Sequence, residues 1–264
     1  MKNFAKIYGK WALVTGASSG IGAEFAQKLA EMGLNLILVA RRQERLEQRA
    51  NALEQDFSIQ VRCLSIDLST ENFIAQVLSE TRDIEIGLLI NNAGFANTGE
   101  FLENDRAREV ELLHVNCRAP MLLSHEYGQH MKKRQKGGII FVSSIAAFSA
   151  MPLWSNYAAT KAYCLLLGEG MANEFKHYGV DVLVVCPGAT RTEFQTVAGV
   201  EAPREMAPDK VVLCAISSLG KKTVVIPGWH NRFIVSSTRL LPRWLNTKRG
   251  HFIVNHIQKK CEIQ

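Results

Sequence analysis

The segment W-A-L-V-T-G-A-S-S-G-I-G, residues 11–22, decides the fold of this chain. Its first five residues form an apolar run of β-strand type, and apolar residues then recur at helical spacing as far as Met32. A strand, a glycine-rich turn and a helix cradle a pyrophosphate, because Gly16, Gly20 and Gly22 allow close backbone approach and the helix N-terminus offers free N–H groups. The spacing G-x-x-x-G-x-G differs from the usual G-x-G-x-x-G fingerprint. Its place between a strand and a helix still predicts a nucleotide site.

Strand-like and helix-like segments alternate along the rest of the chain. Further strands are expected at 34–40, 58–66, 86–90, 138–142, 180–186 and 223–226, and helices at 43–55, 71–81, 106–132, 157–177 and 209–219. This alternation predicts a Rossmann-type α/β fold, a doubly wound parallel sheet of about seven strands with helices on both faces. The length of 264 residues suits a single domain.

Tyr157 and Lys161, with Ser144 thirteen residues before the tyrosine, indicate the chemistry. On a helix the tyrosine and the lysine are i and i+4 neighbours on one face. A phenol normally titrates near pH ~10, and a fixed ammonium close by favours the phenolate and lowers the phenol pKa. A hydroxyl facing the same point would stabilise a carbonyl oxygen as it gains charge. A Tyr-x-x-x-Lys pair alone is common on surfaces, but after a nucleotide-binding segment it suits proton transfer with a carbonyl or alcohol oxygen.

Two arginines follow the second expected strand, which ends at Ala40 near the expected adenosine ribose. Enzymes that use NAD usually place a carboxylate there, whereas guanidinium groups suit the 2′-phosphate of NADP. Here Arg41 and Arg42 follow directly, and the first acid is Glu44. We therefore expect NADP(H) as the preferred cofactor and NAD(H) as the alternative. The competing interpretation is that the arginines are only a solvated helix start.

Six landmarks occur in one order over about residues 8–195. They are T-G-A-S-S-G-I-G (15–22), N-N-A-G (91–94), Asn116, Ser144, the pair Tyr157 and Lys161, and P-G-A-T-R-T (187–192). In this order and spacing they resemble the short-chain dehydrogenase/reductase family. The six together leave little room for a chance match.

The resemblance implies a role for each landmark. The tyrosine matching Tyr157 is the general acid of carbonyl reduction and the base of alcohol oxidation, and the lysine matching Lys161 binds the nicotinamide ribose and lowers the tyrosine pKa. Ser144, rather than its neighbour Ser143, is expected to hydrogen-bond the substrate oxygen, and Asn116 to support a water on the proton path. The implied cofactor site comprises Gly16, Ser18, Ser19, Gly20, Ile21, Gly22, Arg41, Arg42, Asp67, Leu68, Asn92, Ala93, Gly94, Tyr157, Lys161, Pro187, Gly188, Thr190 and Thr192.

The implied activity is an NADP(H)-dependent interconversion of a carbonyl and a secondary alcohol by hydride transfer. Ser19 stands where some NADP-preferring members carry a lysine or arginine, so the cofactor preference depends on Arg41 and Arg42 alone. Substrate choice is expected to depend on residues 146–154 and on the segment after Thr192. Apolar side chains there favour a hydrophobic ketone, a 3-oxoacyl chain or a steroid-like substrate, with core packing an equal alternative: Phe148, Met151, Leu153, Trp154 and Phe194. A non-catalytic nucleotide-binding or regulatory protein on the same fold is the other class of function.

Composition is ordinary for a soluble globular protein, with 47% hydrophobic and 21% charged residues. The six cysteines form no C-x-x-C pair, so neither a disulfide framework nor a metal site is expected, and a reducing cytoplasm fits. The N-terminus lacks the apolar core of a signal peptide, and no run reaches the roughly 18–20 apolar residues that cross a bilayer. We therefore expect a cytoplasmic protein.

The C-terminal region is unusually basic. Residues 210–261 contain ten Lys or Arg and no Asp or Glu, which more than accounts for the net charge of +6. Residues 233–245 interleave apolar side chains with arginines, and Pro242 predicts two short helical pieces. We assign residues 1–228 to the catalytic domain that binds NAD(P) and residues 229–264 to a basic extension.

This extension has several possible roles on sequence grounds. Three alternatives are open: it packs on the same domain, a second subunit covers it, or it lies on an anionic membrane surface. Self-association is the safer expectation, because oligomers are common among the proteins that the chain resembles. The charge also suits an acidic carrier or a CoA-type substrate. Nucleic acid is not expected, since no recognition motif accompanies the charge.

Overall fold

The computed structural model of the protein describes residues 4–201 and 204–258. A seven-stranded parallel sheet with the order β3-β2-β1-β4-β5-β6-β7 forms its centre. The strands are β1 (Trp11–Thr15), β2 (Asn35–Ala40), β3 (Val61–Ser65), β4 (Ile86–Asn91), β5 (Gly137–Val142), β6 (Val180–Val185) and β7 (Val224–Val225). The strand order reverses between β1 and β4, which confirms the expected doubly wound Rossmann-type sheet.

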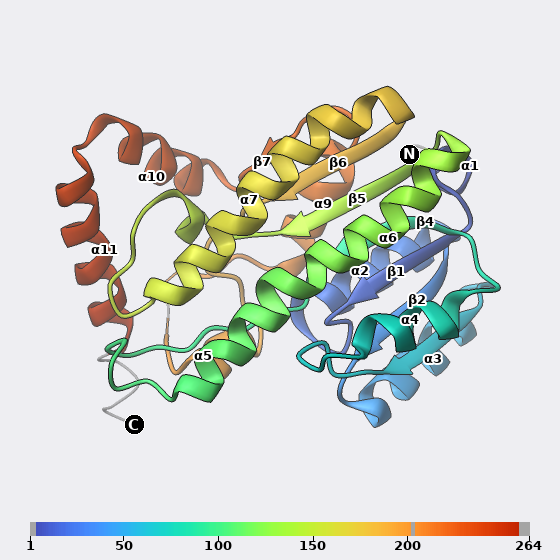
Figure 1. Cartoon of the computed structure of the whole chain (residues 1–264), viewed down its shortest axis with the longest axis horizontal. Coiled ribbons are helices and arrows are strands. Elements are labelled where there is room, and N and C mark those ends of the chain that lie inside the picture. Colours follow the sequence, from blue (N-terminus) through green and yellow to red (C-terminus); the bar gives the residue numbers. More distant parts are fainter. Residues whose placement is uncertain (1–3, 202–203, 259–264) are drawn as a thin grey trace.

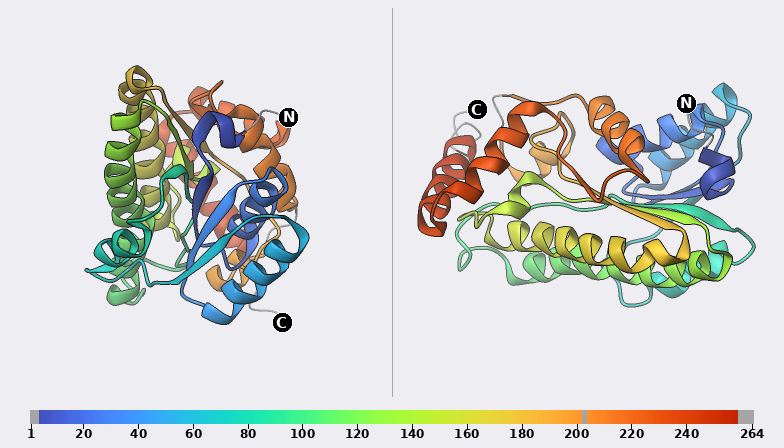
Figure 2. Two further views of the ribbon diagram at one scale, coloured as in Figure 1. Left: turned by 90° about the vertical axis from the view of Figure 1, so that its right-hand side faces the viewer. Right: turned by 90° about the horizontal axis from the view of Figure 1, so that it is seen from above.

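Helices cover both faces of the sheet, as the two layers in Figure 2 show. One layer holds α2 (Gly20–Glu31), α3 (Gln43–Asp56) and α9 (Pro208–Ser218), and the other holds α4 (Phe73–Thr81), α6 (Ala119–Arg134) and α7 (Ser155–Phe175). The short α1 (Phe4–Tyr8) contacts β4 and β5.

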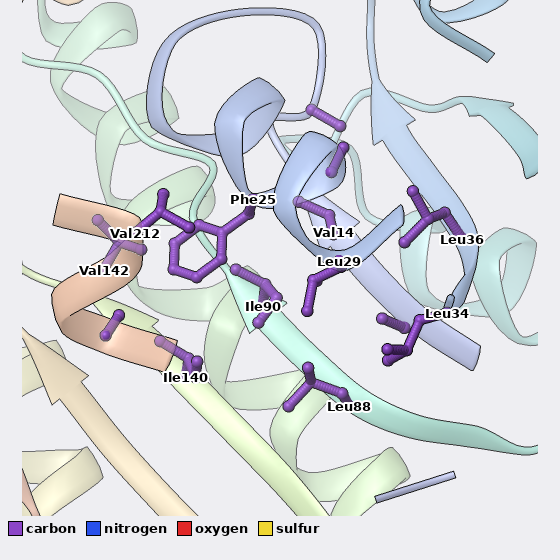
Figure 3. Close-up of a cluster of buried hydrophobic side chains, with 14 of the residues drawn as sticks. Val14, Phe25, Leu29, Leu34, Leu36, Leu88, Ile90, Ile140, Val142 and Val212 are labelled. Atoms are coloured by element: carbon purple, nitrogen blue, oxygen red, sulfur yellow. The ribbon is translucent and has the colours of Figure 1, made fainter. Parts of the chain in front are cut away.

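Fully buried side chains hold the first layer on the sheet (Figure 3). Phe25 and Leu29 of α2 pack against Val14 of β1 and Ile90 of β4, and all four have no exposed surface. Each such side chain stabilises the fold by about 1.5–3 kcal/mol through burial. The helical spacing of these residues therefore fixes how α2, and with it the glycine-rich turn, sits on the sheet.

The helical stretch expected at 106–132 has three parts. It consists of α5 (Arg106–Leu113), a π-helical turn (His114–Arg118) and α6. A π turn inserts one extra residue into the helical path and often marks a functional position. Here it carries Asn116, whose side chain is 2% exposed.

The C-terminal region forms α10 (Trp229–Leu240) and α11 (Arg243–Gln258), which meet at Pro242. This confirms the two helical pieces predicted from the proline. Figure 1 shows both helices beyond one end of the sheet, on the side toward which β5 points. We call residues 229–258 the C-terminal roof. The last six residues of the predicted extension, 259–264 with Cys261, lie outside the described residues. Within the described part of the chain, every helix is too short or too polar to cross a membrane.

Candidate active site

A cavity of about 740 Å³ lies where the strands end. Its walls come from the glycine-rich turn, from the segments that follow β2 to β6, and from α10 and α11 of the C-terminal roof. Ligands of open parallel sheets bind at this edge, where the strand order reverses. Every expected site residue lines this cavity except Gly22 and Asn116.

The glycine-rich turn has the geometry of an anion cradle. Gly16 and Gly20 have φ angles of +66° and +57°, which residues with a Cβ rarely adopt. A Cβ at Gly22 would overlap the carbonyl oxygen of Gly16, so only glycine lets α2 pack this close to the turn. Ser19 gives α2 no side-chain cap, and Gly20 and Ile21 at the start of α2 line the cavity. The first N–H groups of α2 therefore remain for an anionic ligand.

The segment after β4 is tied to this turn. Thr15 Oγ1 accepts hydrogen bonds from the backbone N–H groups of Asn92 and Ala93, both at 3.0 Å. The Asn92 side chain donates to the backbone oxygens of Thr15 at 2.9 Å and of Gly16 at 3.3 Å. Asn92 is therefore structural as well as cavity-lining, because it fixes the turn against β4.

Tyr157 lies at the centre of the candidate catalytic group. Helix α7 places its ring, 5% exposed, beside Trp154 and Phe194, with ring centroids 5.2 Å and 5.5 Å away. Burial raises the pKa of Tyr157 to about 12, and the nearby Ser144 hydroxyl only partly opposes this rise. The lowering of this pKa by Lys161, which the resemblance implies, stays a prediction.

Lys161 lies one turn after Tyr157 and is 5% exposed. Its Nζ donates to the Val142 carbonyl oxygen at 3.0 Å and lies 5.8 Å from the Tyr157 ring centroid. Burial lowers the pKa of the ammonium. The Ser143 hydroxyl donates to the Lys161 backbone oxygen at 2.7 Å, whereas the Ser144 hydroxyl acts on the phenol and lowers its pKa. The geometry thus favours Ser144 over Ser143.

Asn116 lies behind the cavity wall. Its side-chain amide donates to the Phe95 backbone oxygen and to Thr160 Oγ1, both at 3.0 Å, and its Oδ1 accepts from the Phe95 N–H at 3.1 Å. A Cβ at Gly94 would lie 3.0 Å from Asn116 Oδ1 and 3.2 Å from Lys161 Nζ. Asn116 thus stands close to Lys161, but its side chain holds the wall together and does not contact the cavity.

Arg42 lies at the far end of the cavity in a cluster that sequence reasoning missed. It donates to Ser18 Oγ and Ser19 Oγ, both at 2.9 Å, and to Glu193 Oε2 at 2.7 Å. Arg45 also pairs with Glu193. The hydrogen bonds from Arg42 and Arg45 hold the pKa of the Glu193 carboxyl below its usual value. No local pattern in the sequence could have signalled this pair, since Glu193 follows Arg42 by 151 residues.

Arg41 has carboxylate neighbours as well. Its Nη1 lies 3.1 Å from Glu111 Oε1 and 3.9 Å from Asp67 Oδ2. The sequence places no acid directly after β2, but the fold brings these two from other elements. Arg41 and Arg42 both line the cavity, as expected. A bound phosphate would share their N–H donors with the neighbouring carboxylates.

The five apolar residues predicted to choose the substrate divide into two groups. Met151, Trp154 and Phe194 line the cavity. Phe148 packs against the core between the sheet and α7, and Leu153 packs beside the Tyr157 cluster. Met151, Trp154 and Phe194 also belong to the packed cluster around Tyr157, so they combine packing with lining the cavity. Their part in substrate choice stays a prediction.

The C-terminal roof supplies a further part of the cavity wall, which the sequence did not predict. Cavity-lining side chains from α10 and α11 include Ile234, Val235, Thr238, Ile253 and Ile257. At Gly188 a Cβ would meet the Asn231 side chain, so α10 contacts the segment that follows β6 directly.

Residues 10–201 match the sequence model of a family described as short chain dehydrogenase. The match covers most of the 264 residues and includes all six landmarks. The chain belongs to the short-chain dehydrogenase family.

Several short-chain dehydrogenases of known activity are similar over nearly the whole chain. A 7beta-hydroxysteroid dehydrogenase of Clostridium sardiniense is 32% identical over 234 residues, covering 87% of this chain and 90% of the relative. The very-long-chain 3-oxoacyl-CoA reductase of Mus musculus is 28% identical, covering 91% and 78%. A short-chain dehydrogenase from Sphingobium yanoikuyae, solved in complex with NADPH, is 33% identical with a TM-score of 0.80, covering 87% of this chain and 93% of that one. These relatives support a carbonyl/alcohol oxidoreductase.

The short-chain dehydrogenase site offers proton donors and acceptors. Within residues 4–201 and 204–258, no group of three or more His, Cys, Asp or Glu side chains is placed to hold a metal ion. A hydroxyl, a phenol and an ammonium instead line the same cavity as the apolar side chains of the roof. This arrangement suits the exchange of a proton with an oxygen atom held among apolar groups.

Proposed function

We propose that the protein is an NADP(H)-dependent oxidoreductase that interconverts a carbonyl and a secondary alcohol on an apolar substrate. The observation that carries this proposal is that the buried Tyr157 phenol, Ser144 and Lys161 line the same cavity as the glycine-rich turn. An active-site acid of this kind has no evident use in a non-catalytic nucleotide-binding protein.

The residues present fit the proposed cofactor. The glycine-rich turn leaves space and free N–H groups for a pyrophosphate, and Arg42 with the Ser18 and Ser19 hydroxyls forms a donor cluster suited to a 2′-phosphate. Arg41, Asp67 and the remaining cavity-lining landmarks would hold the adenosine and nicotinamide ends. The NADPH bound to the Sphingobium relative supports the choice of NADP(H), with NAD(H) as the alternative.

In the reduction direction, the chemistry that bound NADPH supplies is hydride transfer to the carbonyl carbon. Tyr157 is protonated at neutral pH, so it donates its proton to the carbonyl oxygen as negative charge develops there. Ser144 positions that oxygen by a hydrogen bond. Lys161 places a positive charge beside the phenol and stabilises the phenolate that remains. Asn116 would support the wall and a water through which the proton is replaced.

A tyrosine substitution tests this function. Tyr157→Phe should keep the fold and NADPH binding but lower kcat by about 10²–10⁴-fold, the usual contribution of a positioned proton donor. The matched control is Tyr163→Phe on the same helix, whose side chain is 39% exposed. Retention of near wild-type kcat by the Tyr157→Phe protein on a confirmed ketone would refute the assignment. Binding of NADPH without turnover of any carbonyl compound would favour the non-catalytic alternative.

The substrate class is proposed from the cavity wall. Met151, Trp154 and Phe194 face it from the domain, and the C-terminal roof adds aliphatic side chains. The names of two relatives, a hydroxysteroid dehydrogenase and a 3-oxoacyl-CoA reductase, support a bulky or long apolar ketone.

The outer side of the C-terminal roof is proposed to contact an anionic lipid surface. Trp229, Phe233 and Trp244 are 75%, 69% and 60% exposed, and Lys248 stacks on Trp244 with Nζ 5.2 Å from the ring centroid. Residues 229–258 contain no acidic side chain, so two copies of this surface would repel, whereas an anionic surface would attract it. The homo-oligomer that the sequence analysis expected through this same segment stays a prediction and is the alternative to the lipid contact.

The cellular location also stays a prediction. Of the six cysteines, the five in the described residues are free thiols, which supports the proposed cytoplasmic location.

A further inference from the structure

One face of α11 combines a single cation with apolar side chains. Arg249, Ile253 and Ile257 are spaced by four residues, lie on one face of the helix and line the cavity. The helix approaches the domain closely there, since a Cβ at Gly250 would lie 2.7 Å from the Ala150 backbone oxygen. Arg249 is therefore held above the apolar wall to which Met151 belongs.

The charge of Arg249 is not neutralised within residues 4–201 and 204–258. Its side chain is half-buried and donates to Ser237 Oγ at 2.6 Å, and no carboxylate in that part of the chain forms an ion pair with it. Ser237 itself donates to the Ile234 backbone oxygen, so it accepts only one of the five guanidinium N–H donors. Arg41 and Arg42, in the same cavity, have acidic partners. A half-buried guanidinium without such a partner is suited to a ligand that brings its own negative charge.

We propose that Arg249 binds an anionic group of the substrate at the end remote from the reacting carbonyl. The substrate would then be an amphiphile, with an apolar body along the roof and a carboxylate or phosphate at one end. Both anions present the paired oxygen atoms that a guanidinium fork binds. Arg204 also lines the cavity and has no ion pair in the described residues, but it is exposed. It is the alternative binding partner for the anionic group. The identity of the reacting carbonyl depends on the proposed function, but the anion site itself does not.

Binding of unreactive amphiphiles tests the anion site without any turnover. Isothermal titration calorimetry would compare octanoate, octyl phosphate and 1-octanol on the full-length protein. At least one anion should bind about tenfold more tightly than the alcohol, which equals about 1.4 kcal/mol. Arg249→Gln should remove this difference, and Arg249→Lys should restore part of it. Preference for octanoate or for octyl phosphate decides between a carboxylate and a phosphate.

The matched control is Arg243→Gln, which removes the same charge from an exposed position on α11 that does not line the cavity. Its binding of the anions should equal that of the wild type. Equal binding of all three amphiphiles by the wild type would overturn the proposal. So would loss of the preference in Arg204→Gln with no loss in Arg249→Gln.

Kinetics then separate this inference from the proposed function. For a long-chain keto acid and its methyl ester, Arg249→Gln should raise KM for the acid about tenfold and leave kcat/KM for the ester unchanged. Unchanged turnover of the ester also shows that the variant folds. Anion binding without reduction of any ketone would uphold the anion site and refute the proposed function. Reduction of ketones with no preference for the acid over the ester would support the proposed function and refute the anion site.

Discussion

Replacing Glu193 with glutamine should strengthen NADPH binding and leave NADH binding unchanged. Glu193 accepts hydrogen bonds from Arg42 and Arg45 beside the Ser18 and Ser19 hydroxyls. The proposed 2′-phosphate needs the Arg42 donors, so the carboxylate and the phosphate compete for one guanidinium. Glutamine keeps the size of the side chain and removes its charge.

The expected gain follows from the exposure of the two ion pairs. The side chains of Arg42, Arg45 and Glu193 are 43%, 47% and 45% exposed. Exposed pairs contribute about 0.2–1 kcal/mol each, so freeing both arginines releases at most about 2 kcal/mol. Because about 1.4 kcal/mol corresponds to a factor of ten, the Kd for NADPH should fall by about twofold to at most about thirtyfold. Calorimetric titration with NADPH and NADH measures both values, and the gain should shrink as salt is added.

Glu44→Gln is the control for this experiment. It removes an acid from the first turn of α3, close to Arg42 in the sequence, and its carboxylate forms no ion pair with the arginines in the described structure. It should change the Kd for NADPH by less than Glu193→Gln does. An unchanged Kd for NADPH in Glu193→Gln, or an equal gain for NADH, would show that Arg42 does not bind a 2′-phosphate in competition with Glu193.

The pH dependence, the glycine-rich turn and the roof each give a further prediction. Because burial raises the pKa of Tyr157 to about 12, its phenol keeps its proton below that value. Ionisation of Tyr157 should therefore not lower the rate of ketone reduction up to about pH 10. A decrease in this rate near pH 8 that is absent in Tyr157→Phe would contradict the raised pKa. Gly22→Ala should lower the free energy of unfolding by about 1–3 kcal/mol in denaturant titrations and weaken NADPH binding, because its Cβ overlaps Gly16; unchanged values would exclude the clash. In vesicle sedimentation, the wild type should bind anionic lipid better at low salt, and Trp229→Ala with Phe233→Ala should reduce that binding. A wild type that ignores anionic vesicles, or that self-associates through this surface, would overturn the lipid contact.

The elements that sequence reasoning predicted best are those whose signals are local. The apolar run before the glycine-rich turn and the helical spacing after it are both read within residues 11–32, and Pro242 alone predicts the break between α10 and α11. Four of the six landmarks, at 15–22, 91–94, 144 and 187–192, stand at or just after a strand end, whereas Asn116 and the pair Tyr157 and Lys161 lie on helical elements. A parallel sheet necessarily gathers such positions at one edge.

The features that could not be predicted from the sequence depend on contacts between residues far apart in the chain and on the burial of side chains. Glu193 meets Arg42 across 151 residues, and no composition rule connects them. The direction of the Tyr157 pKa depends on how completely Trp154 and Phe194 exclude water, which spacing does not reveal. The π turn at Asn116 was likewise hidden, since its residues suit an ordinary helix.

The separation of the cavity wall into two stretches of chain has a consequence for how this protein can change. The family match ends at residue 201, whereas the roof begins at residue 229. The residues proposed to hold the cofactor and the two helices that cover the cavity thus lie in separate stretches of one chain. If the proposed function holds, grafting the roof of a relative onto residues 1–228 should change the range of accepted substrates and leave cofactor binding unchanged. Substitutions in α10 and α11 could thus change substrate specificity without any change at Tyr157, Lys161 or Ser144.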